Sequence, residues 1–413
     1  MEVRRVVVTG LGAVTPLGND VKTTWENMIA GKNGIDFVTA FDTTDFKAKL
    51  AGEVKNFDPT LYMPKGDVRK TDLYAQYAVA AAAQAFEDSK IEGTIAPDRL
   101  GVYIGSGIGG IHTLVAEHKK GLEKGMNRIS PYFVPMMISN IASGTVAIRY
   151  NAQGPNIAVV TACATSTNSI GEAYRVIKHG YADAMLAGGS EAAINDICFG
   201  GFISCQALSQ SEDKDRASIP FDKERAGFVM GEGGAVVVLE ELERALARGA
   251  RIYAEVVGYA CTNDAYHMTA PNPEAVASSR AIELAAKEGG VIADEKLYIN
   301  AHGTGTALND KTETAAIKKA FGAAAYKLHV SSTKSMTGHM LGAAGAVEAI
   351  AAVKALKEGV IPPTINYRVK DEECDLNVTP NTAVKAELEF ALSTSLGFGG
   401  HNGCLAFRKF RQE

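Results

Sequence analysis

Four short segments of this 413-residue chain recur later in the sequence, in the same order. Each segment joins a run of Val, Ile or Leu to a turn of Gly and other small residues. The matched pairs are Val3–Gly12 with Ile252–Gly258, Leu100–Gly110 with Leu297–Thr306, Asn156–Ser166 with Leu328–Gly338, and Gly231–Glu240 with Gly400–Lys409. An ordered repeat of this kind is typical of a duplicated structural unit. We therefore predict two related halves, residues 1–250 and residues 251–413, that share one site.

The first of these halves is the longer one, so it must contain insertions. Phe37–Lys70 and Ile111–Pro135 are the segments that we expect to be extra. Throughout the chain, short Val- and Ile-rich runs alternate with Ala-rich helical stretches. This alternation is typical of an α/β fold.

Three helices are predicted from the residues at their ends. Asp72 is a suitable N-cap for a helix over Leu73–Asp88, whose Ala-rich sequence predicts a buried position. Two more helices precede a glycine that can adopt the left-handed conformation at a C-terminus. They are Ser166–His179 before Gly180 and Gly345–Lys357 before Gly359.

The composition excludes several classes of protein. Hydrophobic residues make up 46% and charged residues 22% of the chain, which is ordinary for a globular protein and unlike a disordered or fibrous one. The net charge of −5 argues against a global nucleic-acid role. We expect neither a secretory signal nor a membrane span, because the sequence lacks both patterns. The six cysteines form no CxxC pair, which favours a reducing cytoplasm and argues against a structural zinc site.

A glycine-rich segment, GSGIGG at Gly105–Gly110, follows a predicted strand. It satisfies the G-x-G-x-x-G pattern of dinucleotide-binding loops, and Glu123 could serve as the acidic partner. In a chain with 42 glycines a pattern this short arises easily, so a tight loop that brings the backbone close to other groups is the favoured interpretation. A nucleotide-dependent dehydrogenase stays open as an alternative.

Cys163 is the strongest candidate nucleophile. It follows a predicted buried strand, NIAVV, and precedes the predicted helix at Ser166–His179. The positive end of a helix dipole favours a thiolate over a thiol, so we expect the pKa of Cys163 to fall below its usual value. The N–H groups at the same helix terminus could hold an oxyanion. For the other five cysteines we favour a buried or inert role.

Two histidines have settings that suit partners of this cysteine. His302 directly follows a predicted strand in NAHGTGT, and His339 lies in a glycine-rich loop before a helix. The duplication places both loops at the carboxyl ends of strands, on the same side as Cys163. Lys334 and Glu348 flank His339, and we interpret them as a buried ion pair that orients the histidine. Two unrelated charges are the alternative.

At these residues the chain resembles the β-ketoacyl-acyl carrier protein synthases. The resemblance covers nearly the whole chain, beginning with VVVTGLGAVTPLG. A Cys-His-His set indicates the elongating synthases of types I and II, and the GSGIGG and TACATS segments are most similar to type II. The motifs that carry the resemblance are TACATS around Cys163, NAHGTGT around His302, STKSMTGHMLGAAG around His339, LGFGGHNG near the end, GGSEAAI at Gly188–Ile194 and PFDKERAGFVMGEGGA at Pro220–Ala235.

The resemblance implies a fold and a reaction. The fold is thiolase-like: two βαβαβαββ halves in a layered αβαβα sandwich, usually assembled as a homodimer. The reaction transfers an acyl chain from the phosphopantetheine of acyl carrier protein to Cys163. Malonyl-carrier protein then loses CO₂, and its enolate carbon attacks the thioester to give 3-oxoacyl-carrier protein, in type II fatty acid elongation. No cofactor and no metal are expected for this chemistry.

The resemblance also implies roles for individual residues. The backbone N–H groups of Cys163 and Phe398 would stabilise oxyanions, while His302 and His339 would stabilise the enolate during decarboxylation, with Lys334 and Glu348 in support. Further positions are expected to bind the substrates and the carrier protein. They are Ile108, Phe202 and Phe398 at the acyl pocket, Thr304 and Thr306 at the pantetheine arm, and Lys65, Arg69, Lys70 and Arg128 at an acidic carrier protein.

Two positions depart from the family pattern, and three other functions stay open. Ala226 stands where many relatives have Asp, and Leu396 where an aromatic residue is common. A type I synthase or a polyketide ketosynthase subunit would share the mechanism. A non-catalytic partner subunit such as a chain-length factor would bind and shape the product instead, but those proteins lack the nucleophile that Cys163 supplies.

Overall fold

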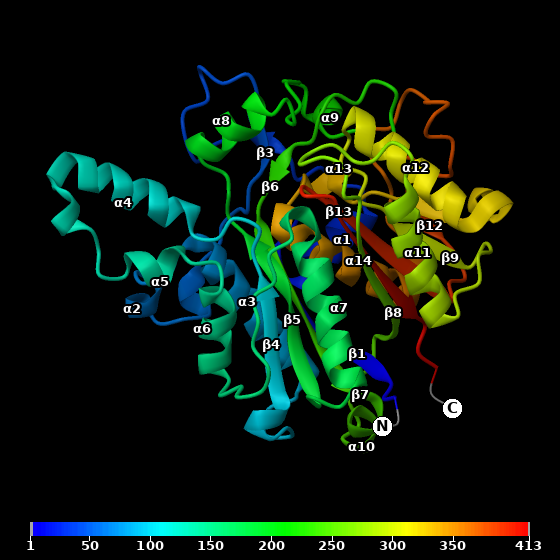
Figure 1. Cartoon of the computed structure of the whole chain (residues 1–413), viewed down its shortest axis with the longest axis horizontal. Helices are drawn as coiled ribbons and strands as arrows, with labels where there is room; N and C mark the ends of the chain where they lie inside the picture. The colour runs from blue at the N-terminus through cyan, green and yellow to red at the C-terminus, as the bar shows by residue number, and fades with distance from the viewer. Residues whose placement is uncertain (1–2, 412–413) are drawn as a thin grey trace.

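A nine-stranded mixed sheet runs through the part of the chain that the structure, a computed structural model, describes: residues 3–411 (Figure 1). The strands β1 and β8 join its two parts, because Val6–Val8 pairs antiparallel with Ala254–Val256. The spatial order of strands is β10 (His329–Ser331), β9 (Leu297–Asn300), β13 (Phe390–Gly397), β14 (His401–Arg408), β8 (Ala254–Asn263), β1 (Val6–Val14), β7 (Gly233–Glu241), β5 (Ala184–Glu191) and β4 (Leu100–Gly105).

The sheet order is mirrored about the contact between β1 and β8. On one side β8 is followed outward by β14, β13, β9 and β10; on the other, β1 is followed by β7, β5 and β4. The strands of the two sides therefore correspond in pairs: β1 with β8, β7 with β14, β5 with β13, and β4 with β9. The chain passes from β7 to β8 through the short helix α10 (Leu242–Ala247).

The long helices form three layers around these two half-sheets. α3 (Leu73–Ser89) packs on β1, β5 and β7, while α11 (Val276–Gly289) packs on β8 and β14. α7 (Thr165–Lys178) and α14 (Ala344–Glu358) contact strands of both half-sheets, so they form the middle layer. α6 (Ile141–Arg149) adds to the outer layer beside α3, and α12 (Ala307–Phe321) adds to the outer layer beside α11. The result is the αβαβα sandwich that the resemblance implied.

Small residues let the two middle helices approach closely. A Cβ on Gly345 would lie 2.1 Å from the Thr167 hydroxyl oxygen, so only glycine fits there. The Ala346 N–H donates to the Ser166 hydroxyl at 2.9 Å, and the Thr167 and Ser395 hydroxyls lie 2.7 Å apart. These contacts fix the N-termini of α7 and α14 next to each other.

The predicted helices are confirmed to within a residue or two. Asp72 caps α3 by accepting a hydrogen bond from the Tyr74 N–H. Gly180, two residues beyond the last residue of α7, has a φ of +79°, and Gly359 ends α14 with a φ of +67°. Both glycines adopt the left-handed backbone that the sequence predicts at these positions.

The predicted buried strand before Cys163 is wrong. Over Asn156–Val160 the backbone makes one bridge, from Asn156 to Val102, and Ile157 and Val160 are 55% and 50% exposed. The segment lies beyond β4 at the edge of the sheet, where the described chain supplies no further strand to cover it. An apolar sequence predicts burial, but this segment lies exposed at an open edge of the sheet.

The two predicted insertions form separate structures on the first half. Phe37–Lys70 contributes β3 (Leu50–Gly52), which pairs with β6 (Met230–Gly231), and ends in α2 (Lys65–Val68). Ile111–Pro135 forms α4 (Ile111–Lys124), which projects from the body together with α5 (Phe133–Met137) (Figure 1).

The remaining elements are short. Apart from 3-10 turns they are α1 (Val21–Ile29), β2 (Asp36–Phe37), α8 (Asp196–Ser204), α9 (Lys214–Ala217), α13 (Lys334–Thr337), β11 (Val360–Ile361) and β12 (Val384–Lys385). Among residues 3–411, no helix has the length and apolar character needed to cross a membrane.

Candidate active site

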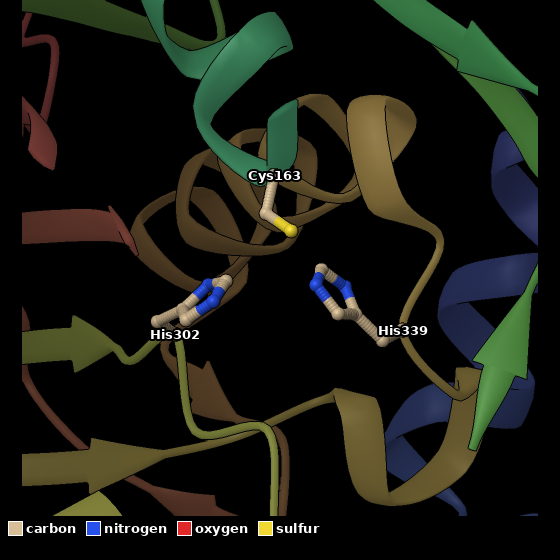
Figure 2. Close-up of side chains that lie close together, drawn as sticks. All are labelled: Cys163, His302 and His339. Carbon is tan, nitrogen blue, oxygen red and sulfur yellow. The ribbon is translucent and has the colours of Figure 1, made fainter. Parts of the chain in front are cut away.

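Cys163 lies at the start of α7, at the centre of the molecule, and its side chain points toward His302 and His339 (Figure 2). It occupies the single 3-10 turn Ala162–Ala164 that leads into the helix, and Ala162 has a φ of +50°. A Cβ on Gly397 would lie 2.7 Å from the Thr161 carbonyl oxygen, so the Gly397–Gly400 turn touches this bend. The Phe398 N–H donates a hydrogen bond to the Cys163 sulfur.

The pKa of Cys163 differs from the expectation. Burial raises this pKa to about 12, although the Lys334 ammonium and the Phe398 N–H both lower it. The sequence indicates the position at a helix N-terminus but not the depth of burial, and here burial has the larger effect. The resting side chain is therefore a thiol that has a hydrogen-bond donor directed at its sulfur.

His302 lies two residues beyond the end of β9, and its ring is oriented by Lys334. The Lys334 ammonium lies 3.3 Å from His302 Nδ1, and because an ammonium only donates, Nδ1 must accept. The ring proton therefore resides on Nε2. Lys334 is itself buried and forms an ion pair with the equally buried Glu348. The structure thus brings together the predicted Lys–Glu pair, and it orients His302 rather than His339.

His339 is held by its own loop. Its Nδ1 accepts a hydrogen bond from the Leu341 N–H at 3.3 Å, so its ring proton also resides on Nε2. That Nε2 atom is buried and has no hydrogen-bond partner among the described residues. The backbone of His339 is fixed by bonds to Val229 and Gly231, and its ring packs edge-on against Phe228 at a centroid distance of 5.1 Å.

Both imidazoles are neutral at physiological pH. Burial holds the pKa of His302 and of His339 well below 6.5, and the positive charge of Lys334 lowers both further. The two rings stand 5.2 Å apart, and a ring nitrogen of each lies with the Cys163 sulfur in a group of atoms within 4.8 Å of one another. This arrangement places two neutral N–H donors opposite a thiol nucleophile.

Glu313, which positions the His302 loop, is a site residue that is not predicted from the sequence. This buried carboxylate on α12 accepts hydrogen bonds from the His302 and Gly303 N–H groups, both at 2.7 Å, and from the Thr394 hydroxyl. Burial raises the pKa of Glu313 to about 7. A glutamate in a helix ordinarily indicates a solvent-facing surface, so only the unusual proximity to NAHGTGT could have singled it out.

A cavity of about 280 Å³ opens onto Cys163, His302 and His339. Thr304 and Thr306, expected at the pantetheine arm, lie in its wall, with their hydroxyls 3.0 Å apart. Phe202 and Phe398, expected at the acyl pocket, line it as well. Leu396, one of the two residues that depart from the family pattern, also lines it. Ala226, the other residue that departs from the family pattern, is exposed and is not part of this wall.

Ile108 does not line this cavity, contrary to expectation. It borders a separate hollow of about 340 Å³ with Leu114 and Met137, and it is 38% exposed. The Ile108 N–H is held by the Glu191 carboxylate at 3.1 Å, which fixes the loop on that side of the molecule. The glycines of Gly105–Gly110 therefore belong to a loop whose backbone N–H groups bind the Glu191 carboxylate. An anion already occupies the N–H groups that a phosphate would need, which argues against a nucleotide site.

The four expected docking residues are all exposed. Lys65 lies on α2, Arg69 and Lys70 follow that helix, and Arg128 lies in the turn after α4. The Lys70 ammonium stands 5.2 Å from the centroid of the Tyr132 ring, which brings the two insertions together at this surface.

The fold and this site define a class of enzyme. A duplicated α/β sandwich that places a thiol at a helix start, facing two neutral imidazoles, is the arrangement of a thiolase-like condensing enzyme. Residues 3–245 match the family model "Beta-ketoacyl synthase, N-terminal domain", and residues 253–368 match the model of its C-terminal domain. The chain therefore belongs to the β-ketoacyl synthase family, as the motifs predict.

Relatives that match over nearly their full length indicate which class of β-ketoacyl synthase this chain resembles. A 3-oxoacyl-[acyl-carrier-protein] synthase 2 of Staphylococcus aureus strain COL is 51% identical over 98% of this chain and 99% of the relative. The enzyme of the same name from Synechocystis is 50% identical over 100% and 99%. These identities confirm the predicted elongating, type II class of acyltransferase.

Solved structures confirm the thiolase-like fold. An ishigamide ketosynthase/chain length factor superposes with a TM-score of 0.92 at 37% identity, covering 99% of this chain and 100% of that one. A type II polyketide ketosynthase, solved in complex with its acyl carrier protein, gives 0.90 at 34% identity over the same shares.

Replacing Lys334 tests the electrostatics of the site. In Lys334→Met, Glu348 becomes an unpaired buried acid, and we expect stability to fall by about 3–5 kcal/mol. Loss of the ammonium should also raise the pKa of Cys163, so iodoacetamide should alkylate the variant more slowly at pH 8. Urea unfolding and alkylation rates measure the two effects. Lys354→Met, which breaks the more exposed pair with Glu358, is the control; faster alkylation of Lys334→Met would contradict this assignment.

Proposed function

We propose that this chain catalyses the decarboxylative condensation of acyl-carrier protein with malonyl-carrier protein, giving 3-oxoacyl-carrier protein and CO₂ in type II fatty acid elongation. The observation that carries the proposal is the pair of neutral Nε2–H donors, on His302 and His339, opposite the Cys163 sulfur. A single base beside a thiol would suffice for acyl transfer alone. Two neutral N–H donors that point to one place can stabilise the thioester oxygen of malonyl-carrier protein, which gains negative charge when CO₂ leaves.

The first half-reaction loads the acyl chain. The Cys163 sulfur attacks the thioester carbonyl of the acyl-carrier protein, and a carbon–sulfur bond forms. The N–H groups of Cys163 and Phe398 stabilise the oxyanion. Collapse breaks the bond to the pantetheine sulfur, which leaves with the proton of the Cys163 thiol. Because neither Nδ1 is free to accept that proton, the leaving thiolate is its natural acceptor.

The second half-reaction extends the chain by two carbons. The thioester oxygen of malonyl-carrier protein accepts the Nε2–H bonds of His302 and His339, and its carboxylate leaves as CO₂. The electron pair that remains on carbon attacks the acyl-Cys163 thioester. Collapse then releases the Cys163 sulfur, which takes up one proton from solvent. Charged imidazoles are not required, which agrees with the lowered pKa of both rings.

A polyketide ketosynthase subunit and a type I synthase share this chemistry. The relatives that are 50–51% identical carry the synthase 2 name, whereas the type II polyketide ketosynthase is 34% identical and the ishigamide ketosynthase/chain length factor 37%. The comparison therefore favours fatty acid elongation over a polyketide role. A chain-length factor would not need the assembled nucleophile and donors that this chain retains.

We also propose that the reaction uses no cofactor or metal. A sulfur and two imidazoles are donor types that zinc accepts, so this set needs a separate argument. The Lys334 ammonium is hydrogen-bonded to one of the two rings and would repel a cation. Zinc also requires a thiolate, and burial opposes that form of Cys163.

Substituting the three central residues separates the two half-reactions. Cys163→Ala should abolish acyl transfer, because no nucleophile remains. His302→Ala and His339→Ala should each lower CO₂ release from malonyl-carrier protein by roughly 10²–10³-fold, the effect of losing one oxyanion donor. Radiolabelled CO₂ release and acyl transfer are measured side by side, with EDTA expected to change neither. Retained CO₂ release in both histidine variants would refute their assigned role.

We propose that an acidic acyl carrier protein binds at Lys65, Arg69, Lys70 and Arg128. One structural neighbour is a ketosynthase in complex with its acyl carrier protein, so carrier binding by this fold is physically possible. These side chains are exposed, and Lys70 connects the two insertions through Tyr132. Positive charges at a rim accelerate association with a negative partner and are screened by salt.

Charge reversal tests the docking surface. Changing Lys65, Arg69 and Lys70 to Glu should raise KM for acyl-carrier protein about tenfold or more and leave KM for small acyl thioesters unchanged, since only the carrier is recognised there. The control reverses one arginine and two lysines that are exposed on the second half: Arg280, Lys287 and Lys327. An equal effect on both substrates, or an equal effect of the control, would reject this surface.

We further propose a homodimer that forms at the edge of the sheet beyond β4. Ile157 and Val160 lie there half exposed on a segment that has one bridge to β4 and faces no strand of residues 3–411 on its outer side, an arrangement that favours pairing with a second copy. The six cysteines are all unpaired, which supports a reducing compartment such as the cytoplasm.

A charge at the proposed dimer edge should split the assembly. In Ile157→Glu, the buried carboxylate would oppose association, so sedimentation velocity should show a shift from dimer to monomer. Ile292→Glu introduces the same charge at an isoleucine that is 63% exposed in the second half, and it should stay dimeric. A monomeric unmodified protein, or an Ile157→Glu variant that remains dimeric, would contradict this interface.

A further inference from the structure

One buried carboxylate, that of Glu191, joins two loops from different halves of the chain. Glu191 is the last residue of β5 and is fully buried. Its Oε1 accepts hydrogen bonds from the Ser106 hydroxyl at 2.7 Å and the Ile108 N–H at 3.1 Å. Its Oε2 accepts from the Gly107 N–H at 2.9 Å and the Gly342 N–H at 3.0 Å. Each oxygen thus receives two donors.

These donors favour the ionised form of Glu191. Three of the four are backbone N–H groups, which cannot accept a hydrogen bond, so a proton on Oε2 would face two N–H groups and displace at least one of them. The pKa of Glu191 lies above its usual value, because burial raises it by more than the four hydrogen bonds lower it. None of the ion pairs among residues 3–411 includes Glu191. The charge is therefore held by hydrogen bonds, without a cation.

The Gly342 contact connects Glu191 to His339. Gly342 lies in the single turn Leu341–Ala343, and the N–H of Leu341 is the donor that fixes the His339 ring proton on Nε2. The two loops touch: a Cβ on Gly342 would lie 2.4 Å from the Gly107 nitrogen and 2.7 Å from Glu191 Oε2. Neither glycine can be replaced without moving the carboxylate.

Glu191 also acts on Cys163 through its charge. A Cβ on Gly107 would lie 2.7 Å from Glu191 Oε2 and 3.5 Å from the carbonyl oxygen of Ala162, the residue before the nucleophile. The ionisable groups around Cys163 are Lys334, Glu191, Glu348, His302 and His339. Lys334 stabilises a thiolate, Glu191 and Glu348 oppose it, and the two neutral imidazoles add no charge.

We propose that Glu191 is a positioning residue of the condensing site: its carboxylate locks the Ser106–Gly109 loop to the Leu341–Ala343 turn, and its fixed negative charge keeps Cys163 a thiol until substrate binds. The first role aims the His339 donor at the malonyl thioester. The second prevents an idle nucleophile from reacting with other electrophiles. Both roles rest on the proposed condensation, but the second is measurable without any substrate.

Glu191→Gln removes the charge and keeps the size of the side chain. The pH at which iodoacetamide alkylation of Cys163 reaches half its maximal rate should fall by roughly one unit, because a nearby negative charge has been lost. Glu240→Gln is the matched control: Glu240 is equally buried, lies on the neighbouring strand β7 and pairs with residue Ala184 at the other end of β5. An unchanged or higher midpoint for Glu191→Gln would overturn the electrostatic role, and so would an equal shift in the control.

Release of CO₂ from malonyl-carrier protein tests the positioning role. Glu191→Gln presents amide hydrogens to backbone N–H groups and should lower the rate roughly tenfold, since a small misplacement of a reacting group has this effect. Ser106→Ala removes one donor and retains the carboxylate, so it should lower the rate less. If Glu191→Gln does not fold, the Ser106→Ala variant tests the positioning role instead. An unchanged rate of CO₂ release in Ser106→Ala would then overturn that role. Failure of the unmodified protein to release CO₂ would instead refute the proposed function and leave the alkylation result intact.

Discussion

The buried ammonium of Lys334 is the charge on which the site depends. It is enclosed between the Glu348 carboxylate and His302 Nδ1, so it compensates one buried acid and fixes the tautomer of one catalytic ring in a single position. An isolated charge at this depth would cost many kcal/mol, and therefore the ion pair and the ring contact must form together. The same positive charge lowers the pKa of both imidazoles and opposes part of the effect of burial on Cys163. One side chain thus adds to the effect of burial that keeps the two rings neutral, and it opposes the effect of burial on the sulfur.

The duplication explains why these groups meet at the centre. Each half has a middle-layer helix preceded by a single 3-10 turn: Ala162–Ala164 before α7, and Leu341–Ala343 before α14. The close contact at Gly345 brings the two helix starts together, so the nucleophile from one half faces the loop of His339 from the other. Neither half contains the complete site. The interface between the halves is therefore also the catalytic centre, and residues that hold it closed, such as Glu191, affect reactivity.

The sequence predicts the chemistry of this protein better than it predicts the environment of each group. Caps, glycine positions and the repeat order predict the helices and the sandwich, because they depend on local backbone geometry and on chain order. Cys163 is found because it lies between an apolar run and the start of a helix, and His302 and His339 because each lies in a glycine-rich loop. Burial is a property of the assembled layers, so the direction of the Cys163 pKa and the importance of Glu191 and Glu313 could not be predicted. The position of the Ile108 loop depends on a hydrogen bond that the Ile108 N–H donates to Glu191, 83 residues later in the sequence, and no local pattern encodes it.

A thiol with a raised pKa is compatible with its role as a nucleophile. The carrier protein delivers its thioester to a fixed position, so the attack does not depend on a large standing population of thiolate. The Phe398 N–H that contacts the sulfur at rest belongs to the turn whose glycines lie against Cys163, and it can transfer to the oxyanion as negative charge moves from sulfur to oxygen. A site that ionises only when that oxygen is present protects its sulfur between turnovers. Opposing buried charges, one ammonium and two carboxylates around a single thiol, are a physical means to that end.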